Sequence, residues 1–213
     1  MISTVAFDIG ETLIDETRIW SRWAERLGVP ALTFMGVLGG VAAQGRSHRE
    51  AFEFFRPGFD IQKELEKWRG DDPDGLRENF DEEDLYPDVR PGLGRLLELG
   101  KRVVIAGNQP RQARGPLEAM KLGATILISA DLGVEKPSSD FFKELCKAAG
   151  FAANEVLYVG DRVDNDVLPA KSAGLHTALI RRGPWGYLQA EWPQAAQADA
   201  IIDSLYEIPD LLV

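Results

Sequence analysis

The sequence lacks the features that would place it among disulfide-bonded, zinc-binding or membrane-spanning proteins. It has one cysteine, Cys146, which excludes an internal disulfide and a zinc site built on several cysteines. Its apolar stretches are too short to cross a bilayer, and its N-terminus has no basic region followed by a long apolar run. We therefore expect a cytoplasmic protein that does not bind membranes.

Positive charge is also scarce. The chain has 24 Lys and Arg residues against 34 Asp and Glu residues, which gives a net charge of -10 and a pI of about 4.8. Such a surface repels phosphate backbones and anionic lipids, so nucleic acids are not expected partners. An anionic substrate would need a bound cation or a suitably placed lysine. The apolar fraction of 45% is that of an ordinary globular protein.

Short, continuous apolar runs rich in β-branched residues are typical of strands buried on both faces of a parallel sheet. Such runs occupy residues 2–8, 102–106, 124–128, 156–159 and 177–180. Helical stretches that end at glycines occupy residues 91–99, 110–122, 138–149 and 163–173. This alternation predicts an α/β fold with a doubly wound, mainly parallel, five-stranded Rossmann-like sheet.

Residues 15–88 interrupt the alternation. Within them, Trp20, Trp23 and Leu27 recur at helical spacing. We predict an all-helical insertion of roughly seventy residues, the size of a small domain. Residues 1–14 and 89–213 would then form the core. Because the insertion leaves after the first strand and returns before the second, it must lie above the strand ends as a cap that excludes water.

Charged residues follow several of the predicted strands. Asp8 ends the first, Lys136 lies in the segment Gly-Val-Glu-Lys-Pro after the third, and Asp161 and Asp166 follow the fourth. Ligands of open α/β sheets bind beyond the carboxyl ends of the strands, so these four side chains should converge. Three carboxylates at close range repel one another. A Mg²⁺ ion with oxygen ligands relieves that repulsion, and Lys136 adds a positive charge for an anion.

These motifs, in this order, resemble the haloacid dehalogenase superfamily of hydrolases. The resemblance implies that Asp8 is the nucleophile that becomes a phospho-aspartate and that Lys136 orients it. It also implies Mg²⁺ bound by Asp8, the backbone carbonyl of Gly10 and Asp161, with Asp166 in or beside the coordination shell. The expected enzyme is a phosphatase that acts on a small phosphorylated metabolite, as a monomer or homodimer.

Two positions depart from the pattern of the family's phosphatases. The second aspartate, which protonates the leaving oxygen, is replaced by Gly10, and the Ser or Thr that holds the phosphate is replaced by Gly107. The resemblance leaves Gly107, Asn108 and Lys136 as the expected phosphate contacts. A missing general acid costs ~10²–10⁴-fold in rate, so we expect a preference for aryl or acyl phosphates. We expect the Glu11 side chain to point away from Asp8.

Other functions remain open at the level of sequence. Phosphonoacetaldehyde hydrolases of the family also lack the second aspartate but use a cap lysine as a Schiff base, and the cap here offers Lys63 and Lys67. Haloacid dehalogenation is another possible function. It needs no metal, so the presence of both Asp161 and Asp166 argues against it. Gly10 and Gly107 also fit a catalytically impaired relative that binds a phosphorylated ligand or a protein partner.

Overall fold

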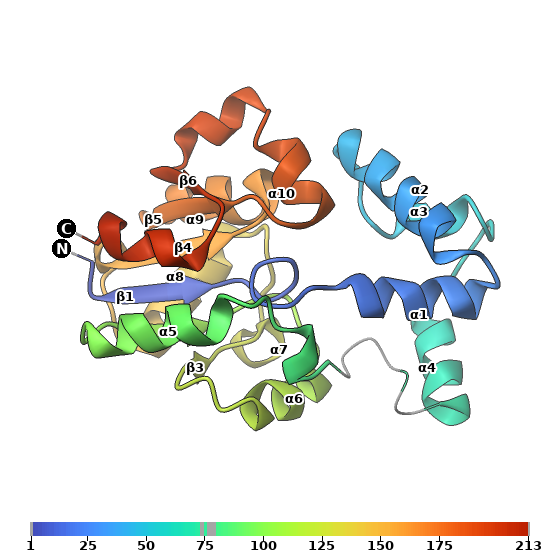
Figure 1. The fold of residues 1–213 in the computed structure, drawn as a ribbon, viewed down its shortest axis with the longest axis horizontal. Coiled ribbons are helices and arrows are strands. Elements are labelled where there is room, and N and C mark those ends of the chain that lie inside the picture. Colours follow the sequence, from blue (N-terminus) through green and yellow to red (C-terminus); the bar gives the residue numbers. More distant parts are fainter. Residues whose placement is uncertain (1, 73–74, 76–79, 213) are drawn as a thin grey trace.

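The computed structural model describes residues 2–72, 75 and 80–212. Residues 73–74 and 76–79 of the predicted insertion, and the two terminal residues, lie outside the described residues. Figure 1 shows a sheet flanked by helices, with both termini at one end and the helices of the insertion at the other. The path of β1 leads directly from the termini toward the insertion.

The sheet has six parallel strands in the order β3-β2-β1-β4-β5-β6. The five predicted strands are present as β1 (Thr4–Phe7), β2 (Arg102–Ile105), β3 (Thr125–Ile126), β4 (Val156–Gly160) and β5 (His176–Ile180). The predicted count of five was wrong, because β6 (Ala200–Ile202) adds an edge strand. This strand is the three-residue run Ala-Ile-Ile, too short to stand out in the sequence, and its Ile201 is exposed.

Helices cover both faces of the sheet. Side chains alternate between the faces along a strand, so Val5 and Phe7 of β1 pack in one apolar cluster with α5 (Val89–Glu98). Ala6, between them, packs in a second cluster with α8 (Ser139–Ala149). Burial on both faces explains why the central strands are apolar throughout rather than alternating.

The predicted insertion contains α1 (Thr17–Leu27), α2 (Ala31–Ala43), α3 (Glu50–Glu53) and α4 (Ile61–Asp71). An aromatic cluster joins these helices. The ring centre of Trp23 lies 5.1 Å from Phe52 and 4.8 Å from Trp68, both edge-on, and Phe52 stacks on Phe59 at 4.8 Å. Edge-on and offset aromatic pairs add stabilisation beyond the area they bury. Trp20 and Trp23 therefore belong to the interior of the insertion.

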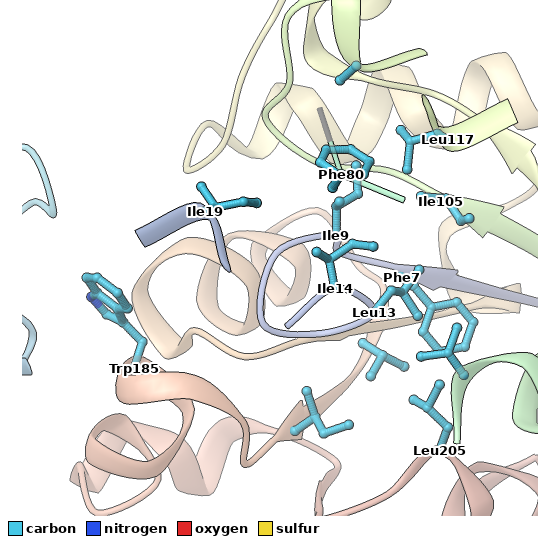
Figure 2. Packing of buried hydrophobic residues seen from close by; sticks show 14 of the residues in the cluster. Phe7, Ile9, Leu13, Ile14, Ile19, Phe80, Ile105, Leu117, Trp185 and Leu205 are labelled. Atoms are coloured by element: carbon cyan, nitrogen blue, oxygen red, sulfur yellow. The ribbon is translucent and has the colours of Figure 1, made fainter. Parts of the chain in front are cut away.

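The apolar core continues from the sheet into the insertion. Ile9, Leu13 and Ile14, in the loop after β1, are each 1% exposed. Figure 2 shows them between Phe7 of β1 and Ile19 of α1. The insertion is also held from the other side, because α2 packs against α10 (Gly183–Gln189).

The remaining helices are short, and a single π-helical turn, Val163–Val167, precedes one of them. They are α6 (Arg114–Ala119), α7 (Ser129–Leu132) and α9 (Leu168–Ser172), with 3₁₀ segments at Glu82–Asp84, Arg111–Ala113, Ala153–Glu155, Pro193–Gln197 and Leu205–Leu211. Within the described part of the chain, no single helix has the length and apolar character to span a bilayer. Only α1 and α2 taken together pass that test, and they are bent by 111°.

Candidate active site

Two adjacent strands, β1 and β4, bring the predicted carboxylates together. Asp8 follows β1, and its amide donates a hydrogen bond of 2.8 Å to the carbonyl of Val159 in β4. Asp161 directly follows β4, and Asp166 lies in the π-helical turn beyond it. One carboxylate oxygen from each of the three lies within 4.8 Å of the others, and all three residues are buried. This set, hereafter the carboxylate cluster, offers only hard oxygen donors, which suit a divalent cation such as Mg²⁺.

Lys136 joins the carboxylate cluster as predicted. Its Nζ atom lies 2.7 Å from Oδ1 of Asp8 and 2.6 Å from Oδ1 of Asp166, and its side chain is 1% exposed. Although burial disfavours the ammonium group, the charges of Asp166 and Asp8 raise the pKa of Lys136 well above its ordinary value. The lysine is therefore a fixed positive charge in direct contact with Asp8.

Negative charge nevertheless exceeds positive charge in the cluster. Burial, followed by repulsion from Asp166 and Asp8, raises the pKa of Asp161 well above its ordinary value. Burial also raises the pKa of Asp166, to about 6, even though Lys136 pulls it down. Protonation or a cation is needed to stabilise three buried carboxylates that face one lysine.

Two glycines make room for the cluster. A Cβ on Gly160 would lie 2.4 Å from Cγ of Asp166, and a Cβ on Gly107 would lie 2.5 Å from Oδ1 of Asp8. Both distances are shorter than real Cβ contacts, so a side chain at either position would displace a carboxylate. At position 107, where the resemblance leads one to expect Ser or Thr, the space is taken by the carboxylate of Asp8.

The Asn108 side chain holds the backbone of Lys136 in place. Its Nδ2 donates to the carbonyl of Lys136 and its Oδ1 accepts from the Lys136 amide, both at 2.8 Å. This pair of hydrogen bonds ties the end of β2 to the segment between α7 and α8. Asn108 thus positions Lys136 in this structure, and its direct contact with a phosphate stays a prediction.

Gly10 lies in the loop after β1, where it pairs with Ile14. The next residue, Glu11, has a positive φ of 52° and is buried. Its Oε2 accepts a hydrogen bond from the Tyr86 hydroxyl, and its Oε1 accepts one of 3.2 Å from the Glu16 amide. Burial, together with the charge of Glu16, raises the pKa of Glu11 to about 7. Glu11 and Glu16 are therefore two further acidic residues beside Gly10, separate from the carboxylate cluster.

Sequence reasoning missed Glu16, Tyr86 and Arg182 as residues near the site. Arg182, after β5, donates from Nη1 to the carbonyl of Thr12 at 2.6 Å and lies 4.3 Å from the ring centre of Tyr86. None of the three belongs to a strand-end motif. Tyr86 and Arg182 reach the loop after β1 only through the fold, and the position of the Glu16 side chain depends on where α1 begins.

Comparison with known proteins places these features in a family. A family model described as haloacid dehalogenase-like hydrolase matches residues 2–174. The phosphoglycolate phosphatase of Chromobacterium violaceum is 34% identical, and the alignment covers 99% of this chain and 96% of that protein. The glyceraldehyde 3-phosphate phosphatase of Methanopyrus kandleri is 37% identical over 107 residues, which are 47% of this chain and 45% of that protein. The chain thus spans about half the length of the second relative.

Solved structures show the same architecture. A haloacid dehalogenase-type phosphatase from Thermococcus onnurineus has a TM-score of 0.61 at 24% identity and covers 99% of this chain and 98% of its own. A hydrolase of the same type from Bacillus subtilis, solved with bound magnesium, has a TM-score of 0.71 at 18% identity with the same coverage of both chains. At these identities the likeness concerns the fold.

Fold and site together define a hydrolytic enzyme built on a doubly wound parallel sheet with its chemistry at the carboxyl edge. The chain belongs to the haloacid dehalogenase-like hydrolase family, which the match over residues 2–174 and the nearly full-length relative establish. The resemblance drawn from the sequence motifs is confirmed.

Proposed function

We propose that this protein is a Mg²⁺-dependent phosphatase that hydrolyses a small phosphorylated metabolite through a phospho-aspartate on Asp8. The observation that carries the proposal is the contact of Lys136 Nζ with Oδ1 of Asp8 at 2.7 Å, inside a buried cluster of three carboxylates. An ammonium fixed at that distance orients the Asp8 carboxylate and offsets negative charge beside it, which favours attack by a nucleophilic carboxylate.

Two displacements would complete the reaction. In the first, an oxygen of Asp8 attacks phosphorus, and the bond between phosphorus and the leaving oxygen breaks. In the second, water attacks the same phosphorus, which releases inorganic phosphate and restores the Asp8 carboxylate. Lys136 stabilises the negative charge that spreads over the phosphoryl oxygens in both steps. A Mg²⁺ ion held by Asp8, Asp161 and Asp166, with the Gly10 carbonyl, would neutralise further charge on the phosphoryl group.

The named activities of the relatives support a small aliphatic substrate. The Chromobacterium violaceum relative is a phosphoglycolate phosphatase and the Methanopyrus kandleri relative a glyceraldehyde 3-phosphate phosphatase. Both names describe short-chain alkyl phosphates. The net charge of -10 disfavours a polyanionic partner, in keeping with a small substrate.

The phosphonatase-like alternative finds less support. That chemistry needs a cap lysine with a lowered pKa, which burial provides. The insertion has only two lysines in sequence, Lys63 and Lys67, and both are exposed on α4. The side chain of Lys63 is 84% exposed and faces Asp60 at 3.7 Å.

Release of inorganic phosphate from a panel of phosphorylated metabolites, with Mg²⁺ and with chelator, tests the proposal. We expect turnover of at least one short-chain alkyl phosphate, lost on chelation. Asp8→Asn should lower it by about 10⁴-fold or more without unfolding the protein. Asp199→Asn is the matched control, since this carboxylate pairs with Lys171 at the opposite end of the sheet. A folded Asp8→Asn variant with wild-type turnover would overturn the nucleophile assignment.

A further inference from the structure

The space beside Gly10 is occupied by a carboxyl group from another part of the chain. A Cβ placed on Gly10 would lie 2.5 Å from Oε1 and 2.8 Å from Cδ of Glu16. Both distances are shorter than any real Cβ contact. The Glu16 carboxyl therefore fills the position that a side chain two residues after Asp8 would take.

The placement of Glu16 is not explained by the helix that it begins. Glu16 is the N-cap residue of α1, a position where the shorter side chains of Asp, Asn, Ser and Thr usually accept a hydrogen bond from the first turn. Its side chain makes no such bond, and the residue is 8% exposed. It turns instead toward the loop after β1, where its own amide is held by Oε1 of Glu11.

The surroundings of Glu16 connect it to the carboxylate cluster. A narrow pocket is lined by Glu16, Ile9 and Gln109, among others. Ile9 directly follows Asp8 in the chain. Gln109 comes two residues after Gly107, and a Cβ placed on Gly107 would lie 2.5 Å from Oδ1 of Asp8. Glu16 thus faces the rim where β1 and β2 end, on the side where the insertion begins.

We infer that Glu16 is the general acid and base of this enzyme, supplied from the start of the insertion in place of the carboxylate absent at Gly10. The inference rests on the proposed phosphatase function. When Asp8 attacks phosphorus and the bond to the leaving oxygen breaks, the Glu16 carboxyl gives its proton to that oxygen, so an alcohol departs. The Glu16 carboxylate then takes a proton from the water that attacks the phospho-aspartate, and its starting state is restored.

This assignment changes the substrate expected from sequence alone. Gly10 by itself predicts a preference for aryl and acyl phosphates, whose leaving groups need no proton. With Glu16 as the acid, the enzyme is suited to alkyl phosphates, whose alkoxide leaving groups require one. Short-chain alkyl phosphates are also the compounds for which the two relatives are named.

The test compares two probes, phosphoglycolate and 4-nitrophenyl phosphate, in Glu16→Gln. We expect kcat for phosphoglycolate to fall by ~10²–10⁴-fold and kcat for the aryl ester to fall by at most about tenfold. Glu25→Gln, an exposed change on the same helix, should alter neither. A Glu16→Gln variant with a wild-type ratio of the two rates would overturn the inference while leaving the phosphatase proposal intact. A wild-type protein inactive on every phosphate ester would instead overturn the proposed function.

A double variant decides the question independently. Glu16→Ala removes the group that occupies the space beside Gly10, so Gly10→Asp can be added there without overlap. We expect the combination Glu16→Ala with Gly10→Asp to hydrolyse phosphoglycolate at least tenfold faster than Glu16→Ala alone, with little change on the aryl ester. Equal phosphoglycolate rates in the two folded proteins would contradict a role for a carboxyl at this position. If Glu11 is the acid, Glu11→Gln and not Glu16→Gln will change the ratio of the two rates, and the inference fails.

Discussion

Two buried clusters of charge among the described residues differ in the balance of their acidic and basic groups. The carboxylate cluster sets Asp8, Asp161 and Asp166 against Lys136. The second, hereafter the Arg182 pair, joins Arg182 to Asp88, whose Oδ2 also accepts from the Ser204 hydroxyl at 2.7 Å and the Leu205 amide at 2.8 Å. Both clusters are close to fully buried. The Arg182 pair is one charge against one, whereas the carboxylate cluster carries two more acidic than basic groups.

The difference separates a structural role from a chemical one. A balanced buried pair needs no added cation to neutralise its charge, and its hydrogen bonds tie the C-terminal segment to α5 and to the loop after β1. A surplus of buried carboxylates is unfavourable until a cation or a proton arrives. Such a surplus is therefore expected at a site that binds an ion during its reaction.

The largest contrast should appear in stability without metal. Removing one partner of a buried ion pair leaves an uncompensated charge, so Asp88→Ala should lower the free energy of unfolding by about 3–5 kcal/mol. Asp161→Asn removes one of three buried carboxylates that face a single lysine. In chelator, the free energy of unfolding of this variant should therefore be no lower than that of wild type. Urea denaturation of the three proteins measures both effects.

A larger loss of stability in Asp161→Asn than in Asp88→Ala would contradict the roles assigned to the two clusters. If Asp161→Asn loses several kcal/mol in chelator while Asp88→Ala loses less than about 1 kcal/mol, the carboxylate cluster is the structural one. The Arg182 pair would then have no energetic role in the fold.

A smaller contrast should appear in the response to Mg²⁺. An ion that binds only the folded protein stabilises it by about 2.7 kcal/mol at a hundred times its Kd, which for a chain of this size raises Tm by roughly 5–10 °C. Wild type and Asp88→Ala should both show this rise, and Asp161→Asn should show little or none. Differential scanning fluorimetry across a Mg²⁺ titration gives the comparison. An undiminished rise in Asp161→Asn would place the ion elsewhere.

The smallest expected effect is on how the free energy of unfolding changes at low pH. Although burial alone would raise it, hydrogen bonds from Arg182, Ser204 and the Leu205 amide hold the pKa of Asp88 below its usual value. A lowered folded-state pKa gives stability that is present above the unfolded pKa of about 3.9 and lost as pH falls through the folded pKa. The difference in unfolding free energy between wild type and Asp88→Ala should therefore be constant from about pH 5 to pH 7 and shrink below about pH 4. A difference that grows in acid would contradict the assigned direction.

The sequence predicts the parts of the molecule that follow from local pattern. Continuous apolar runs located the buried strands, and the rule that parallel strands end at one edge brought Asp8, Lys136, Asp161 and Asp166 together. The edge strand β6 was missed because its apolar run, Ala200–Ile202, is only three residues long. The place of Glu16 could not be predicted, since it depends on where the first helix begins relative to the loop after β1.

The order of the strands has a consequence for how the enzyme is made. The strand that carries Asp8 is synthesised first, yet it lies in the middle of the sheet and pairs Thr4 with Arg102 on one side and with Val156 on the other. Pairings between such distant segments form slowly, and a growing chain can offer β1 only β2 as a neighbour until β4 has emerged. Asp161 and Asp166 emerge later still. A nascent chain therefore cannot assemble the carboxylate cluster before its central strands can pair, and a complete cluster marks a chain whose sheet has closed around β1.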